Sequence, residues 1–317
     1  MRDELIVETA NTATLAFDAR RLGTVNIVRG RGSVRWWHIG EFVVTPTAGY
    51  NEISSKERGF IIPFNYETDF GLHAEWPSDW GTFEGVIGAN LRDDDDDVVR
   101  GQLNWNRWIG EKVRTDVNVW LNEVVDDTPI VRVIGTKYKF AVTVLGQITR
   151  YDSLRLTADG HRYQTRDGER IADGYRLDAT LEHYILRKAP EWSVRLQGSW
   201  EGNSVAARLP AGTESVYFTE TPTMSSIVSP EFGTFGAGTT VRVGSPEGVI
   251  RRPFLVADAW IGILSPSNTF AYSTSIGTGM SFSGRDKISV HAFHANTQGG
   301  QADNAYEGVG ITYSYLF

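Results

Sequence analysis

The residues best suited to chemistry are acidic and lie in two segments. Five consecutive aspartates, Asp93 to Asp97, follow Arg92, and a second acidic pair is formed by Asp126 and Asp127. Carboxylates concentrated in one place create a field that attracts cations and repels anions. An acidic run can also be a solvated loop tip or a divalent-cation site. The two segments therefore predict a cation-attracting surface, with the tip and the cation site as alternatives.

The other side chains do not indicate a catalytic or metal site. The chain has no Cys, which excludes disulfides, thiolate metal sites and cysteine nucleophiles. None of its six His lies in a GxSxG or HExxH motif. The net charge of −8, without a basic face, argues against nucleic-acid binding. We therefore predict no catalytic residue, no metal, no cofactor and no nucleic-acid partner, with a hydrolase as a weaker alternative.

The elements that position these residues are predicted from the alternation of side chains. Residues 259–284 carry no charge, yet they include Pro266 and many Ser, Thr and Gly residues, and no stretch of 18 apolar residues occurs in the chain. With period two, large side chains from Phe270 to Phe282 fall on one face and small ones on the other. The segment therefore predicts two strands and a turn.

The last segment indicates what the large face contacts. Val309, Ile311, Tyr313, Tyr315 and Phe317 alternate with residues that are mostly small or polar, and the chain ends on the aromatic ring. A bacterial outer-membrane β-barrel requires this pattern, because one face of each strand contacts lipid and the other a watery lumen. A soluble sandwich or propeller shares the many short strands and is the alternative.

The whole chain divides into sixteen such segments. Each has about the length that a tilted membrane strand needs, and an even number fits a single-chain bacterial barrel. The predicted strands are residues 12–20, 25–36, 40–50, 64–76, 80–92, 97–108, 113–125, 137–148, 153–164, 175–188, 192–206, 231–243, 252–264, 269–283, 286–297 and 306–317. The predicted fold is all-β: a transmembrane, antiparallel, up-and-down β-barrel of 16 strands.

Connections and tryptophans predict the orientation of this barrel. In an up-and-down barrel, alternate connections lie at the same end. The connections at the end that contains Phe317 are short except for 244–251, and most connections at the opposite end are longer. Six of the ten Trp flank the short connections: Trp36, Trp37, Trp76, Trp80, Trp108 and Trp192. Bacterial barrels have short periplasmic turns, longer outer loops and aromatic girdles. We therefore expect both termini in the periplasm and the acidic segments at the outer mouth.

The N-terminal part of the prediction is the least regular. No signal peptide pattern is present, so we expect residues 1–11 to be a periplasmic lead-in from the upstream region of a longer protein, and 12–317 to form the barrel. Pro46 lies inside the third strand, and a closed barrel has no free edge to hold it. We expect a bulge there, and the register of the first three strands is the least defined.

Two segments carry a resemblance to a known family. Residues 126–135, DDTPIVRVIG, follow the seventh predicted strand, and residues 231–242, EFGTFGAGTTVR, form the twelfth. With the sixteen-strand layout and the acidic mouth, they resemble the C-terminal domain of the PelB family, and the cellulose exporter BcsC is the runner-up. The resemblance implies a bacterial outer-membrane conduit for a cationic exopolysaccharide, surrounded by lipid and lipopolysaccharide and preceded by periplasmic tetratricopeptide repeats. A general porin is a further alternative.

The resemblance also implies roles for individual residues. Acidic loop residues would attract the emerging polymer, lumen side chains would give it sliding contacts, and the loop 207–230 is long enough to fold into the mouth as a gate. The residues concerned are Asp93, Asp94, Asp95, Asp96, Asp97, Asp126 and Asp127 for attraction, Asp116, Asp258, Trp120 and Trp260 for sliding contacts, and Val216, Tyr217, Phe218, Thr219 and Glu220 for the gate.

Overall fold

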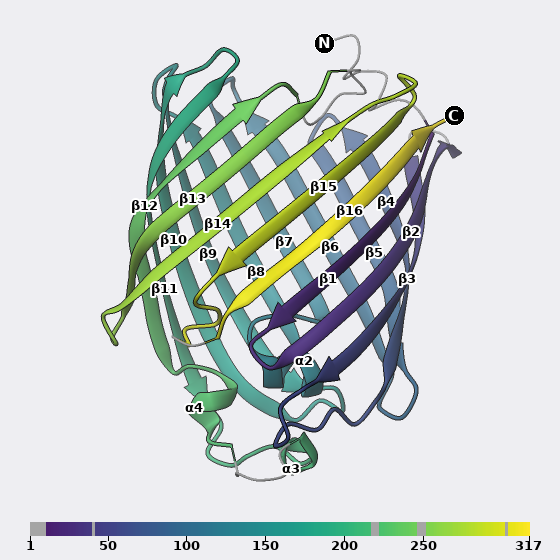
Figure 1. Cartoon of the computed structure of the whole chain (residues 1–317), viewed down its shortest axis with the longest axis vertical. Coiled ribbons are helices and arrows are strands. Elements are labelled where there is room, and N and C mark those ends of the chain that lie inside the picture. Colours follow the sequence, from purple (N-terminus) through teal and green to yellow (C-terminus); the bar gives the residue numbers. More distant parts are fainter. Residues whose placement is uncertain (1–10, 40–41, 217–221, 246–251, 302–303) are drawn as a thin grey trace.

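Alternating side chains along the chain produce strands that close on themselves. The computed structural model describes residues 11–39, 42–216, 222–245, 252–301 and 304–317. Within these residues, sixteen antiparallel strands form one closed barrel, in which each strand pairs with its neighbours in sequence and β1 pairs with β16 (Figure 1). The predicted up-and-down barrel is therefore confirmed.

The strand bounds agree closely with the alternation. The strands are β1 (Thr12–Leu22), β2 (Val25–Ile39), β3 (Phe42–Ser55), β4 (Tyr66–Ser78), β5 (Gly81–Arg92), β6 (Val98–Ile109), β7 (Val113–Glu123), β8 (Gly135–Gln147), β9 (Asp152–Thr165), β10 (Arg170–Leu186), β11 (Glu191–Val205), β12 (Glu231–Val243), β13 (Phe254–Ser265), β14 (Thr269–Met280), β15 (Asp286–Ala295) and β16 (Tyr306–Leu316). The largest errors are at β3, which extends five residues past 50, and β10, which begins five residues before 175. Both extensions lie beyond the outward-facing apolar alternation, and their apolar side chains, Ile53, Ile171 and Ala172, are buried at the end of the barrel that carries the long loops.

The two faces of the sheet have different environments. On β13, Ile261 and Ile263 are exposed on the outside, whereas Asp258 and Trp260 lie on the opposite face, toward the lumen. On β1, Leu15 and Phe17 are likewise exposed outward. An apolar outer band with polar side chains inside is the arrangement that a bilayer requires.

Pro46 is accommodated without the predicted bulge. The β2–β3 ladder has the same register on both sides of Pro46 and only lacks the pairs at Thr45 and Pro46, whereas its register shift lies between Trp37 and Ile39. Proline has no N–H to donate, so losing these pairs is sufficient to keep the ring within the strand. The prediction of a bulge at Pro46 is therefore wrong.

The two ends of the barrel differ in what they carry. At one end, Phe317 donates its N–H to the carbonyl of Asn11 at 3.0 Å; we call this end the terminal rim. The short helices α2 (Pro129–Ile134), α3 (Thr213–Val216) and α4 (Met224–Ile227) lie at the opposite end, the loop rim (Figure 1). None of the helices among the described residues is long and apolar enough to cross a membrane.

A capped pore as the candidate functional site

Paired charges line the lumen. On one strand, residues two apart share a face, and this spacing brings Arg114 within 2.8 Å of Asp116 and Arg176 within 2.9 Å of Asp178. Neighbouring strands supply further pairs, such as Lys139 with Asp159 at 3.6 Å. The wall is therefore hydrophilic, and its charges largely compensate one another.

Three connections at the loop rim bury a common apolar cluster, and we call them the cap. They are residues 56–65, residues 124–134, which include α2, and the described part of 206–230, which includes α3 and α4. The cluster joins Phe60, Phe64, Ile130, Val131, Val133, Val216, Ile227 and Val228 of the cap to Val25, Ile27, Ile53, Tyr163, Ile171 and Ala172 of the wall. Figure 1 shows α2 within the lower part of the barrel, with α3 and α4 below it. The α2 part of the cap lies within the lumen at the loop rim (Figure 1), and a cavity of about 140 Å³ lies between the cap and the wall of β9 to β13.

The chain around α2 explains why this short helix forms. Thr128 is its N-cap and accepts a hydrogen bond from the N–H of Val131 at 3.3 Å, while Pro129 occupies the first turn, where its missing N–H costs nothing. The hydroxyl of Thr128 also donates to the carbonyl of Ile227 at 2.8 Å. One residue thus begins α2 and joins it to α4.

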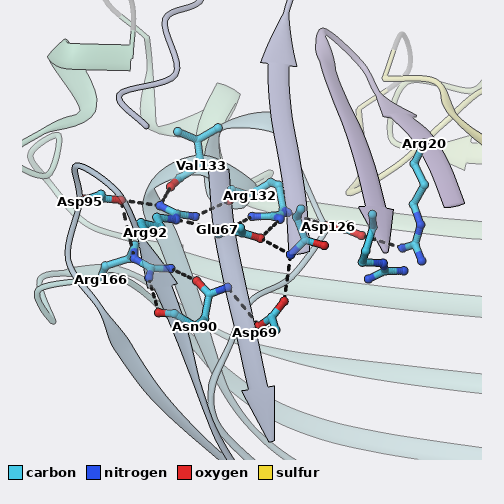
Figure 2. A network of polar contacts seen from close by, with 12 residues as sticks. Arg20, Glu67, Asp69, Asn90, Arg92, Asp95, Asp126, Arg132, Val133 and Arg166 are labelled. Carbon is cyan, nitrogen blue, oxygen red and sulfur yellow. Dashed lines mark hydrogen bonds and ion pairs between the residues drawn. The ribbon is translucent and has the colours of Figure 1, made fainter. Parts of the chain in front are cut away.

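Glu67 on β4 attaches α2 to the barrel wall. Its buried carboxylate accepts hydrogen bonds from both terminal nitrogens of Arg132, one of them at 3.2 Å, and from Nε of Arg92 at 3.2 Å (Figure 2). Two guanidinium groups around one carboxylate leave a positive charge in excess. Asp126, at 3.0 Å from Arg132, and Asp95, in contact with Arg92, offset it.

Arg92 also satisfies the C-terminal end of α2. Its guanidinium donates to the carbonyl oxygens of Arg132 and Val133 and lies over the ring of Phe64, 3.7 Å from the centroid. The last carbonyls of a helix have no partner within the helix, and a cation there is favourable. Arg92 therefore connects β5, α2 and the 56–65 connection at one point.

Asp127 provides a second attachment. Its carboxylate accepts a hydrogen bond from Nζ of Lys137 at 2.9 Å and one from the hydroxyl of Tyr163 at 2.6 Å. Burial acts to raise the pKa of Asp127, but Lys137 and Tyr163 stabilise the ionised form and hold that pKa at about 2. Asp127 is therefore ionised at physiological pH and bound to the wall at β8 and β9.

The predicted acidic run lies at the loop rim beside the cap. It consists of Asp93, Asp94, Asp95, Asp96 and Asp97 between β5 and β6. Asp93 accepts hydrogen bonds from the backbone and side-chain nitrogens of Asn65 at 3.0 and 2.9 Å. Asp94 and Asp96 are exposed. Part of the run thus supports the loops, and attraction of a polymer stays a prediction for the exposed members and for Asp126 and Asp127.

The predicted lumen aromatics differ in their accessibility. Trp120 is half-buried, with Nζ of Lys139 lying 5.0 Å from a ring centroid. Trp260 is only 9% exposed, because it lies against Gly236 and Gly262, where an added Cβ would come within 2.7 Å of the indole ring. A sliding contact is therefore easier to make at Trp120 than at Trp260.

The predicted lumen carboxylates both have arginine partners. Asp116 is paired with Arg114, and Asp258 accepts two hydrogen bonds from Arg195 at 2.6 and 2.9 Å. Of the predicted gate residues, Val216 is buried in the cap cluster. The others, Tyr217, Phe218, Thr219 and Glu220, lie outside the described residues.

The most buried of the described histidines is not part of a hydrolytic site. The most buried one, His161, lies between Asp159 at 2.8 Å and Asn203 at 2.9 Å, so no hydroxyl occupies the position of a nucleophile. Among the residues that the structure describes, no group of three His, Asp or Glu side chains could hold a metal ion.

Comparison with known proteins identifies the family. The family model described as "PelB, C-terminal beta barrel domain" matches residues 7–316. The chain belongs to the PelB C-terminal β-barrel family. It is a β-barrel of the bacterial outer membrane. A search of curated protein sequences finds no match.

Solved structures show the same fold as this PelB-family barrel at low sequence identity. A "Bacterial polysaccharide outer membrane secretin" is similar with a TM-score of 0.69 and 9% identity, over 96% of this chain and 98% of the other. CdiB from Acinetobacter baumannii is similar with a TM-score of 0.54 and 10% identity, over 97% of this chain and 60% of the other. At such identities the likeness shows the architecture alone.

Sequence reasoning missed the residues that attach the cap of this PelB-family barrel. Glu67 and Arg92 were indistinguishable from other charged residues on or beside the strands, because alternation gives a face and no partner. A signal did exist at Arg132, which is the only charged residue in the apolar stretch PIVRVI. A charge within an apolar helix is almost never buried without a partner, so a buried carboxylate could have been expected near it.

Proposed function

We propose that this barrel is an outer-membrane pore through which a secreted polysaccharide leaves the cell, with the cap closing the pore at rest. The observation that carries the proposal is the combination of a family match over residues 7–316 with a hydrophilic lumen that ends under a packed cap. Sixteen strands enclose more space than their own side chains fill, so the fold alone favours a conduit.

The terminal rim faces the periplasm in this proposal, and the loop rim faces the exterior. The connections at the terminal rim are short except for the one between β12 and β13, and four connections at the loop rim have ten or more residues. This difference supports the orientation, because bacterial barrels have short periplasmic turns and longer outer loops. A polymer would then enter at the terminal rim and leave beneath the cap. Periplasmic tetratricopeptide repeats upstream of the barrel would deliver it.

The polymer is proposed to carry positive charge, as partly deacetylated amino sugars do. The support is the exposed pair Asp94 and Asp96 beside the exit, where a negative field would favour a cationic chain. Inside the lumen the charges are balanced, so a polymer of either sign would meet partners along the wall. A cellulose-type exporter and a general porin are the alternatives.

Export and conductance test this proposal together. A producing strain in which the barrel is replaced by a Glu67→Gln variant should still secrete the polymer, whereas deletion of the barrel should abolish secretion. Purified barrel in planar bilayers should conduct poorly with its cap closed. High constant conductance of the unmodified protein would favour a general porin, and hydrolysis of a lipid, peptide or glycan by pure protein would favour an enzyme.

A further inference from the structure

A second cavity opens at the terminal rim, at the opposite end of the barrel from the cap. It holds about 210 Å³ and is bounded by β6, β8, β9, β10 and the turns between them. Its aromatic residues are Trp108, Tyr151 and Tyr184, and its polar groups include those of Gln147, Arg155, Glu182 and Arg187. None of these residues takes part in the cap, so the cavity is separate from the closed exit.

The alternation of side chains along the strands places the residues that line this cavity on the lumen face. On β10, Leu177 and Leu181 are exposed to the outside, so Glu182 and Tyr184 lie on the other face. The same alternation places Trp108 of β6 and Arg155 of β9 inside, in one ladder row with Arg114 and Leu145 between them. A polymer entering at the terminal rim would pass these side chains first.

The chemistry of the lining fits a sugar ring. A pyranose has a face of C–H groups, which can contact an aromatic ring, and edges of hydroxyl groups, which hydrogen-bond to donors and acceptors. Ligand sites generally combine an apolar surface with a few converging polar groups. Trp108 is 51% exposed and therefore free to make such a contact. Arg155 is exposed, and the Glu182 carboxylate already accepts one hydrogen bond, from the hydroxyl of Ser193 at 2.7 Å.

The charge of the lining distinguishes between sugars. Four basic side chains and two acidic ones surround the cavity, and the guanidinium of Arg187 lies over Tyr184, 5.1 Å from its ring. A basic excess repels a protonated amine and leaves an uncharged acetamido group unaffected. This preference is opposite to that of the acidic loop rim.

We propose that this cavity is an entry subsite that binds a neutral, N-acetylated sugar unit of the exported chain. The proposal rests on the proposed function, since it assumes a polysaccharide that enters at the terminal rim. It adds a residue-level specificity: acetylated units are held at the entrance by Trp108 and Tyr184, while free amines are drawn forward to the acidic exit.

Calorimetry on the purified full chain in detergent micelles tests the subsite. The probes are tetra-N-acetylchitotetraose, its fully deacetylated counterpart at pH 6, and tri-galacturonic acid as an anionic control. The acetylated probe should bind at least about fivefold more tightly than the deacetylated one. Trp108→Ala should weaken its binding at least about fivefold, Trp108→Phe should retain most of it, and Tyr184→Leu should weaken it independently.

The matched control is Trp192→Ala, since Trp192 flanks the same rim but is exposed on the outer face. Heat-modifiable migration in gels verifies that each variant is folded. Unchanged binding in Trp108→Ala, equal binding of the two amino-sugar probes or tighter binding of tri-galacturonic acid would each overturn the subsite. A barrel that binds the acetylated probe as expected but supports no secretion would instead overturn the proposed export function.

Discussion

Glu67 shows how one buried carboxylate decides the position of a whole loop. Taking charges out of water is costly, and a buried ion pair offsets this cost only when its hydrogen bonds are complete. The hydrogen bonds around Glu67 are nearly complete. Arg132 and Arg92 both donate to its carboxylate, and Asn51 donates at 3.0 Å. Such a network favours one arrangement of α2 over others, because any other arrangement would leave a buried charge unpaired.

Replacing Glu67 with Gln should release the cap. The amide has nearly the same shape but leaves two buried guanidinium groups without their shared anion, which costs about 3 to 5 kcal/mol in comparable sites. We expect a higher conductance in planar bilayers and faster hydrogen exchange of the α2 amides. The matched control is Glu84→Gln, a half-buried lumen carboxylate that lies 3.8 Å from His73. Equal effects of the two substitutions would contradict the role of Glu67.

Asp127 should make the cap sensitive to strong acid only. Its pKa in the folded protein, about 2, is below the value of about 3.9 for a free aspartate. The stabilisation is therefore complete above about pH 4 and is lost as the pH falls through 2. Conductance should stay low from pH 7 to 4 and rise below that. In Asp127→Asn the conductance should already be raised at pH 7; a wild-type rise near pH 6 would argue against this carboxylate.

The strands and the cap differ in how far sequence could predict them. Large and small side chains alternate within the sequence of each strand, so the segment from Phe270 to Met280 can be recognised as a strand without knowing its partner strands. The helix α2 has only six residues, too few for a helical period, and it is stable because Glu67, 65 residues away from Arg132, lies beside it. Contacts of this range leave no periodic signal, so the sequence predicts a loop 207–230 that folds into the mouth but gives no sign that α2 and residues 56–65 belong to the cap.

The two main parts of the cap should contribute unequally. Replacing residues 127–134 with a short Gly-Ser linker removes α2 from inside the barrel, whereas deleting residues 216–226 removes chain that includes most of α4. We expect conductance to rise in both variants and to rise more in the first. A larger rise in the second, measured in the same bilayers, would show that the 206–230 connection is the principal barrier.

The distribution of charge over the whole barrel separates its exit from its lumen. The lumen carboxylates Asp116 and Asp258 are paired with arginines, whereas Asp94 and Asp96 are exposed at the loop rim. In a Glu67→Gln background, where the pore is open, Asp94→Asn with Asp96→Asn should reduce the preference for cations, and the reduction should be largest at low salt. Reversal potentials in a salt gradient measure this preference. Glu111→Gln, at the exposed turn of the terminal rim, is the control, and an equal effect there would contradict an exit-specific field.

The orientation of the barrel can be tested directly because the chain has no cysteine. Ser225 in α4 is exposed at the loop rim, and Glu111 is exposed in the turn between β6 and β7 at the terminal rim. If the loop rim faces the exterior, a membrane-impermeant maleimide should label Ser225→Cys in intact cells but label Glu111→Cys only after the outer membrane is permeabilised. The opposite pattern would reverse the proposed direction of export. It would also place the Trp108 cavity at the exit, where it could not select units that enter the pore.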